Sequence, residues 1–155
     1  MSYNKLVIVS GYFNPLHQGH LDLFETAKKI GDLCVIVNND VQVKLKGTIP
    51  FLDEETRYRI IKNIHIVGKT YLSIDDTLDI SKTIEYVVDN SATFIESNVA
   101  PMLFFLNSGD RTTTVSPEDK ICKELGILQL YANLPKVESS SLLLQKSYEW
   151  LRKYK

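Results

Sequence analysis

The sequence predicts an α/β protein with a doubly wound, Rossmann-like sheet of five parallel strands and helices on both faces. Short apolar runs recur along the 155 residues, as in strands that are buried on both faces of a parallel sheet. Segments with apolar residues at helical spacing separate these runs. The first strand, helix and strand follow one another within about 35 residues, which is typical of a right-handed βαβ unit.

The first βαβ unit begins at the run LVIVS, which predicts a strand at 6–10. The run LCVIVNN predicts the second strand at 33–39. Between them, apolar residues at three-residue steps predict a helix of about 12 residues that ends at Gly31; they are Leu21, Phe24, Ala27 and Ile30. The segment that follows, 41–50, is expected to be a loop.

The rest of the chain predicts three further strands and four helices. The strands are expected at 70–74, 102–110 and 127–131, and the helices at 53–66, 80–88, 117–125 and from Ser139 to the end. Ser139 is expected to cap the last helix, on which Leu144, Tyr148 and Leu151 share a face. Segment 89–101 receives no assignment.

Composition indicates one folded domain over 1–155. The formal net charge is −1, so no overall field attracts nucleic acid or an anionic membrane. The longest apolar runs are far shorter than the ~20 residues that cross a bilayer, and the first residues do not resemble a secretory leader. We expect a cytoplasmic protein without a nucleic-acid or membrane partner. Cys34 and Cys122 are expected to remain unpaired.

The segment GYFNPLHQGH after the first strand carries the clearest chemical signal. His17 and His20 lie three residues apart at the start of the first predicted helix, so both rings project from one face. A helix start presents unpaired N–H groups to an anion, and Gly19 allows close approach of a phosphate. The two imidazoles could then donate hydrogen bonds to a phosphoryl group. The alternatives are a surface pair, a packing feature or a metal site. For the metal site, the i, i+4 spacing and the acidic partner of zinc helices are missing.

The segment resembles the signature of the cytidylyltransferase-like family of nucleotidyltransferases, a first strand followed by G-x-F-D-x-x-H-x-G-H. The matching residues are Gly11, Phe13, His17, Gly19 and His20. The sequence departs from the signature at Tyr12, where small residues are usual, and at Asn14, where Asp is usual. The resemblance implies catalytic histidines and a nucleotide held by Gly11–Asn14 and Gly19.

The resemblance extends along most of the chain. Lys44 and Lys46 match lysines that contact the triphosphate and the acceptor phosphate, although without the family they would be interpreted as residues of a solvated loop. Arg57 matches a family arginine that we expect to bind the substrate phosphate. Independently, Ile60, Ile61 and Ile64 place Arg57 on the apolar side of its helix, where it needs an anionic partner. An internal ion pair with an acidic residue is the alternative.

Two later segments complete the nucleotide site that the resemblance implies. NSGDR takes the place of a glycine-acidic turn near the base, with Gly109, Asp110 and Arg111; alternatively, Asp110 only holds Arg111. VESSSLLL takes the place of a Ser/Thr-rich segment, with Ser139, Ser140 and Ser141. These serines could also serve only as a helix cap. Lys136 is the nearest cation where the family often has an arginine.

The expected activity is transfer of a nucleoside monophosphate from CTP or ATP to a phosphorylated small molecule, with Mg²⁺ accompanying the nucleotide and no metal held by the histidines. CTP with an alcohol phosphate or sugar phosphate is favoured. The alternatives are an adenylyltransferase acting on a sugar 1-phosphate or a pantetheine-phosphate-like acceptor, and a non-catalytic nucleotide sensor. The resemblance also implies a homodimer.

Overall fold

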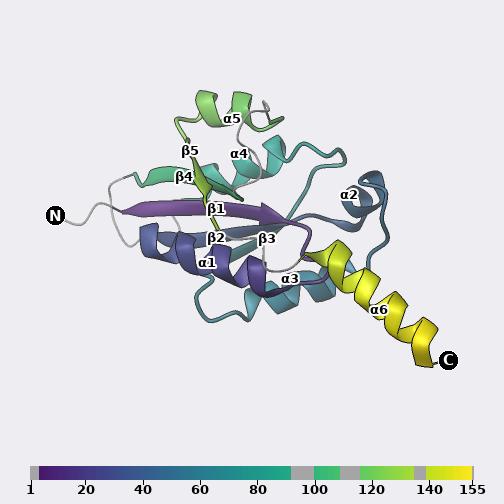
Figure 1. The fold of residues 1–155 in the computed structure, drawn as a ribbon. Coiled ribbons are helices and arrows are strands. Elements are labelled where there is room, and N and C mark those ends of the chain that lie inside the picture. The colour runs from purple at the N-terminus through teal and green to yellow at the C-terminus, as the bar shows by residue number, and fades with distance from the viewer. Residues whose placement is uncertain (1–3, 92–99, 109–115, 135–138, 155) are drawn as a thin grey trace.

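The centre of the computed structural model is a parallel sheet, seen edge-on in Figure 1. The structure describes residues 4–91, 100–108, 116–134 and 139–154. Within these ranges the sheet has five strands in the order β3-β2-β1-β4-β5. They are β1 (Lys5–Gly11), β2 (Asp32–Val37), β3 (Lys69–Leu72), β4 (Met102–Ser108) and β5 (Leu128–Ala132). All four strand pairs are parallel, which confirms the predicted fold class.

Helices cover both faces of this sheet. In Figure 1, α1 and α3 lie on one face and α4 and α5 on the other, while α2 lies beyond the ends of the strands. Their bounds are α1 (Gln18–Ile30), α2 (Asp40–Leu45), α3 (Glu54–Lys62), α4 (Ser81–Asp89) and α5 (Asp119–Glu124), and the chain continues into α6 (Ser140–Tyr154). None of the described helices is long and apolar enough to cross a bilayer.

Alternation along the strands divides the core into two layers. Val7 and Val9 of β1 pack with Phe24 of α1 on one face, whereas Leu6 and Ile8 pack with residues of α4 and α5 on the other. Because successive side chains of a strand point to opposite faces, a continuous apolar run fills both layers. Cys34 and Cys122 are free and buried, and both belong to the second layer.

The connection from α1 to β2 is very short. α1 ends at Ile30 and β2 begins at Asp32, so Gly31 alone joins them. A Cβ atom at Gly31 would lie 2.5 Å from the backbone oxygen of Lys5. Since real Cβ atoms essentially never come so close to backbone, glycine is required here by close approach to β1.

Two elements differ from the sequence prediction by more than two residues, in both cases because of side-chain caps. Most of α2 (Asp40–Leu45) lies within the segment predicted as a loop. The helix forms because the side chain of Asn39 accepts a hydrogen bond from the backbone N–H of Gln42, and the side chain of Gln42 accepts one from the backbone N–H of Asn39. Helix α3 ends at Lys62 rather than near Ile66. There the side chain of Asn63 donates to the carbonyl of Arg59 at 2.7 Å, which terminates the helix.

Helix α6 begins as predicted but does not pack as predicted. The Ser139 hydroxyl accepts from the N–H of Leu142 at 3.1 Å, which confirms Ser139 as the cap. The helix then projects away from the body of the protein (Figure 1). No residue of α6 is buried, so the face shared by Leu144, Tyr148 and Leu151 is not part of the core.

Candidate active site

The two histidines form the first turn of α1. His17 is the N-cap residue, and its Nδ1 accepts from the N–H of Gly19 at 3.1 Å. His20 stands at the third helical position, and its Nδ1 accepts from the N–H of His17 at 3.2 Å. This is a reciprocal capping box made of imidazoles instead of a Ser/Thr and a Glu. The amide of Gly19 is therefore used within the cap.

The cap determines which nitrogen of each ring carries the proton. A nitrogen that accepts a hydrogen bond from a backbone N–H cannot itself be protonated, so each imidazole is neutral with its hydrogen on Nε2. The Nε2–H groups are hydrogen-bond donors on the sides of the rings that face away from the capping bonds. The capping bonds at the start of α1 therefore leave each imidazole with its Nε2–H as a hydrogen-bond donor.

The two rings are stacked on each other. Their centroids are 3.7 Å apart with an interplanar angle of 26°, and Phe13 packs edge-on against His20 with centroids 4.9 Å apart. Burial, then the neighbouring His17 and then Lys46 lower the pKa of His20 from 6.5 to about 3. His20 is therefore neutral throughout the physiological pH range.

The turn that carries the histidines is packed closely. Phe13 is buried and has a positive φ of 50°, which is uncommon for a residue with a side chain. A Cβ atom at Gly11 would meet the Phe13 ring at 2.9 Å. Gly11 therefore provides room for Phe13, which in turn packs against His20.

Asn14 joins this turn to the loop before α3. Its side-chain N–H donates to the carbonyl of Ile49 at 2.8 Å, and its Oδ1 accepts from the N–H of Phe51 at 2.8 Å. Asn14 is 6% exposed. An aspartate would accept the second bond but could not donate the first. Asparagine at this position, unlike the aspartate of the family signature, can therefore make both bonds to this loop.

Only one of the two predicted lysines has a described contact with this cluster. The Nζ atom of Lys46 lies 4.2 Å from the centroid of the Tyr12 ring, and its charge acts on His20. Lys44 and Lys46 are both exposed. Because residues 40–45 are helical, the two lysines leave the backbone in different directions rather than sharing one side of a loop.

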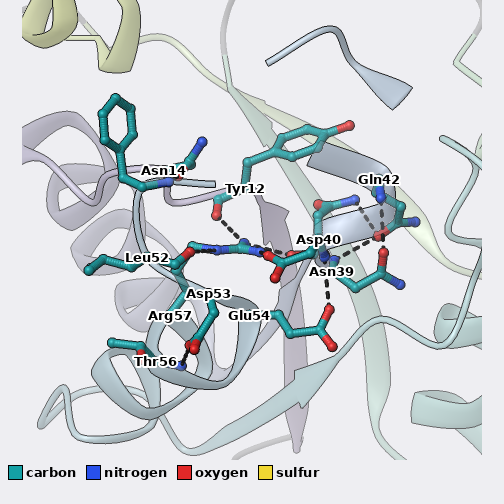
Figure 2. A network of polar contacts seen from close by, with 12 residues as sticks. Tyr12, Asn14, Asn39, Asp40, Gln42, Leu52, Asp53, Glu54, Thr56 and Arg57 are labelled. Carbon is teal, nitrogen blue, oxygen red and sulfur yellow. Dashed lines mark hydrogen bonds and ion pairs between the residues drawn. The ribbon is translucent and has the colours of Figure 1, made fainter. Parts of the chain in front are cut away.

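Arg57 is buried at the centre of a network that connects three segments (Figure 2). Its Nη1 donates to the carbonyls of Tyr12 at 2.7 Å and Asn38 at 2.6 Å, and its Nε donates to that of Leu52 at 3.1 Å. Its Nη2 forms an ion pair with Asp40 at 2.6 Å. The inward orientation of Arg57 is confirmed. The internal ion pair, which the sequence left open as the alternative, is the contact present in the structure.

These bonds determine what Arg57 can still do. A guanidinium has five N–H donors, and four of them are used by partners within the described part of the chain. The fifth donor, one N–H of Nη2, has no partner among the described hydrogen bonds, and the side chain is 0% exposed. The side chain therefore acts first as a clamp between the loops that follow β1 and β2 and the loop that precedes α3.

The polar residues that support this clamp were not predicted from the sequence. Asp40 receives the ion pair, and its N–H donates to Glu54 Oε2 at 2.8 Å. The buried Asn39 donates to the carbonyls of Ser73 and Asp75, which fixes the loop after β3. The Asn-x-x-Gln spacing of 39–42 is a capping-box signal that could have predicted α2. Nothing in the sequence distinguishes Asp40 as the partner of Arg57.

The serine segment lies beside the histidine turn. The Ser140 hydroxyl donates to the carbonyl of Pro15 at 3.0 Å, so the start of α6 touches the turn that carries His17. Ser139 is occupied as the cap, and Ser141 is exposed. The predicted residues Gly109, Asp110 and Arg111, and Lys136, lie outside the described residues.

Comparison with known proteins supports the assignment made from the sequence. The pattern of the cytidylyltransferase-like family matches residues 8–135, which is most of the chain. The chain belongs to this family. Members of the cytidylyltransferase-like family include the relatives described next, whose names confirm the predicted enzyme class, nucleotidyltransferase.

The relatives carry more than one name. The chain is 28% identical over 120 residues to an FAD synthase from Thermoplasma acidophilum, covering 73% of this chain and 83% of the relative. It is 39% identical over 84 residues to an FAD synthase from Ferroglobus placidus, which is 53% of that protein. It is also 41% identical over 76 residues to the bifunctional protein HldE from Histophilus somni, but only 16% of HldE is covered.

Solved structures of similar fold exist. A lipopolysaccharide core biosynthesis protein from Thermoplasma volcanium aligns over 86% of this chain and 98% of its own, with 25% identity and a TM-score of 0.65. A bifunctional NMN adenylyltransferase/ADP ribose pyrophosphatase from Francisella tularensis, in complex with AMP and a manganese ion, aligns over 96% of this chain and 42% of its own. With 13% identity and a TM-score of 0.57, this second structure supports the fold alone.

Proposed function

We propose that this cytidylyltransferase-like protein transfers a nucleoside monophosphate from an NTP to a phosphorylated small molecule and releases pyrophosphate. The observation that carries the proposal is the stacked pair His17 and His20, in which each Nδ1 accepts a backbone N–H. The two Nε2–H groups are then positioned in advance as donors to phosphate oxygens, and they need no reorganisation during the reaction.

The proposed reaction is a single displacement. A phosphate oxygen of the acceptor attacks the α-phosphorus of the NTP, a new P–O bond forms, and the bond from that phosphorus to the bridging oxygen breaks. The bridging oxygen leaves with the electron pair as part of pyrophosphate. The acceptor phosphate is already ionised at neutral pH, so no side chain has to remove a proton from it.

The work of the protein is therefore positioning and charge stabilisation. Negative charge grows on the oxygens around the α-phosphorus and on the leaving pyrophosphate. His17 and His20 donate to these oxygens from the helix start, and the ammonium groups of Lys44 and Lys46 approach from α2 and its end. In this proposal Arg57 holds the three loops in place and offers its remaining N–H to the acceptor phosphate.

The nucleotide-contacting roles proposed for the other residues follow the family resemblance. They belong to the turn after β1, the start of α1, the segment that follows β4 in the sequence and the start of α6. The residues are Gly11, Tyr12, Phe13, Asn14, Gly19, Gly109, Asp110, Arg111, Ser139, Ser140 and Ser141. The bond from Ser140 to Pro15 supports this role for α6, because it brings the serine segment to the histidine turn.

Mg²⁺ fits the proposal as a companion of the NTP. Within the described ranges, no group of three His, Cys, Asp or Glu side chains is placed to hold a metal ion. Mg²⁺ is commonly bound by substrate phosphates and water with few protein ligands, so this arrangement is compatible with it. When bound, the ion would neutralise charge on the triphosphate.

Two pairs of nucleotide donor and phosphate acceptor are supported by different observations. The sequence favoured CTP with an alcohol or sugar phosphate. The FAD synthase from Thermoplasma acidophilum favours ATP with FMN, because FAD carries an adenylyl group on FMN. A structural feature agrees with a flat apolar acceptor, since Ile49 and Phe51 are 69% and 47% exposed on the loop that Asn14 holds.

The experiment is a pyrophosphate-release assay with ATP, CTP, GTP and UTP, each paired with FMN, glycerol 3-phosphate, ethanolamine phosphate and a sugar 1-phosphate. We expect one pair to give turnover that the double variant His17→Ala/His20→Ala reduces by about 10² or more. Unchanged turnover of that variant would exclude the mechanism. NTP binding without turnover in any pair would favour a nucleotide sensor instead.

The proposal includes two properties of the whole protein. We expect it to act in the cytoplasm, without nucleic acid or membrane partners, and to form a homodimer as the family resemblance implies. The enzyme assay does not depend on either property.

A further inference from the structure

Helix α6 presents an apolar face that the described parts of the chain leave largely exposed, with Leu143 and Leu144 half-buried at its start. Successive residues turn by about 100° around a helix, so six large side chains fall within an arc of about 160°. They are Leu143, Leu144, Tyr148, Trp150, Leu151 and Tyr154. Tyr148, Trp150 and Tyr154 are 62%, 61% and 62% exposed. The charged side chains of α6 lie outside this arc, on the other side of the helix.

Such a helix requires packing to be stable. Isolated helices of about 15 residues are marginal in water, and most helical stability in proteins comes from a packed apolar face. α6 has 15 residues and none is buried. Its first turn is fixed to the body through Ser140 and Pro15, whereas the rest projects into solvent (Figure 1).

Ser147 lies at the middle of the apolar arc and is its smallest member. A small residue allows two helix backbones to approach closely. The Ser147 hydroxyl already donates to the carbonyl of Leu143 at 3.1 Å, so its burial would leave no unsatisfied donor. The centre of the face therefore suits a helix crossing.

We propose that the apolar face of α6 is the contact between two copies of this chain, with the two helices antiparallel and crossing at Ser147. The inference rests on the homodimer proposed above but not on the reaction. A two-fold contact is self-complementary, so Leu144 and Leu151 of one copy meet Leu151 and Leu144 of the other.

The exposed area is of the size that such a contact requires. Aromatic side chains bury about 150–250 Å² each, and the three aromatic side chains of α6 are about three-fifths exposed. Together with Leu151, two copies would bury roughly 700–1,000 Å² from these side chains alone. The remaining leucines and the stems of flanking lysines add to this, which reaches the about 1,000 Å² expected of a specific interface.

The charge of the chain favours a second copy over an anionic membrane. Basic and aromatic side chains also occur in helices that lie on membranes, and Arg152 stacks over Tyr148 at 5.9 Å. However, the whole chain has a net charge of −1, so no general attraction draws it to anionic lipid. A membrane-bound helix also gains nothing from a small residue at the centre of its apolar face.

The proposed contact would also affect the active site. In an antiparallel pair, the end of the partner's helix lies beside the start of α6, where Ser140 touches Pro15. Holding α6 in place would therefore hold the turn that carries His17.

The test uses the full chain with single cysteines on opposite sides of α6. Ser147→Cys should form a covalent dimer on mild oxidation, because helix axes 8–10 Å apart bring facing Cα atoms within the about 4.4–6.8 Å of a disulfide. Gln145→Cys on the polar side is the matched control and should cross-link at least about tenfold less. The native cysteines are both buried and give little background.

Sedimentation equilibrium of the unmodified protein and of Ser147→Glu and Ser147→Ala supplies the second measurement. We expect dimers for the wild type and Ser147→Ala, and monomers with an unchanged circular dichroism spectrum of the body for Ser147→Glu. A monomeric wild type, equal cross-linking of the two cysteine variants, or a dimer that survives Ser147→Glu would overturn the proposal. So would a monomer that binds phosphatidylglycerol vesicles through this face. A dimer without nucleotidyl transfer would contradict only the proposed function.

Discussion

The guanidinium of Arg57 lies 2.6 Å from the carboxylate of Asp40, measured from Nη2 to Oδ1, and its other bonds reach carbonyls in three separate segments. The arginine belongs to α3, yet most of its partners precede α3 by many residues in the chain. One buried cation thus holds together the loops on which the histidines and lysines depend.

Loss of this clamp should destabilise the fold. Arg57→Met leaves three carbonyls and a partly buried carboxylate without their donor, so we expect the free energy of unfolding to fall by about 3 kcal/mol or more. Arg59→Met, on the exposed side of the same helix, is the control and should change it by less than about 0.5 kcal/mol. Urea unfolding followed by circular dichroism measures both. Equal stability of the two variants would show that the clamp is not structural.

Capping and catalysis by His17 can be separated. Asparagine can accept the N–H of Gly19 as Nδ1 does, but it lacks the Nε2–H donor. His17→Asn should therefore retain stability to within about 0.5 kcal/mol, whereas His17→Ala should lose about 1 kcal/mol. Both should lose about 10² in turnover. Urea unfolding and pyrophosphate release provide the two readouts, and an active His17→Asn would remove the donor role.

Stability should depend on the protonation of His20. Its pKa is about 3 in the folded protein, mainly because of burial, and 6.5 when unfolded, so protons bind preferentially to the unfolded chain between these values. The stabilisation is complete above about pH 6.5 and is lost as pH falls toward 3. Between pH 6.5 and 5 the loss from this group is about 1.5 kcal/mol.

The control for this pH dependence is His20→Asn, which can keep the capping bond but does not titrate. Unfolding of both proteins would be followed in urea at pH 5, 5.5, 6, 6.5 and 7. The wild type should lose more stability on acidification than His20→Asn. Parallel curves would mean that His20 keeps an ordinary pKa in the folded state.

Lys46 should contribute more than Lys44 to activity. Lys46 is placed over Tyr12 and acts on His20, whereas Lys44 has no described contact with this cluster. We expect Lys46→Met to reduce turnover by about 10² and Lys44→Met by clearly less. Burial and His17 would still lower the pKa of His20, but Lys46→Met should raise it relative to the wild type, as measured by NMR titration. Equal losses of turnover would place both lysines at the phosphates.

Restoring the family's aspartate at position 14 should harm this chain. Asn14→Asp loses the donor to Ile49 and places a carboxylate against that carbonyl in a buried position. A loss of about 1–3 kcal/mol in the free energy of unfolding is expected. Differential scanning calorimetry would detect it, and Asn14→Asp as stable as the wild type would mean that the loop readily finds another arrangement.

Much of the fold could be predicted because it depends on local patterns. Continuous apolar runs identified the strands, and the position of the histidines after β1 followed from a strand ending at Gly11. The features that were not predicted depend on single side chains. Asn39 and Asn63 start and end helices through bonds that hydrophobic spacing does not reveal. The partner of Arg57 depends on contacts between residues 17 positions apart, which one sequence does not identify.

The candidate site divides in the same way. The capping role of the histidines is local and could have been predicted from the spacing of donors and acceptors, but their protonation follows only from the observed bonds. The role of Asn14 depends on the loop at 49–51, which is distant in sequence. The apolar face of α6 was visible as a pattern in the sequence, whereas the absence of buried residues from α6 was not.

The single-residue connection at Gly31 makes the two ends of the sheet unequal. Gly31 lies against the backbone of Lys5 at the start of β1, so the end of the sheet where the strands begin has no space there for an added residue or even a methyl group. Insertions and deletions during evolution would therefore accumulate at the opposite end, in the loops around the histidines. Acceptor preference could diverge there while the framework beneath it remained unchanged.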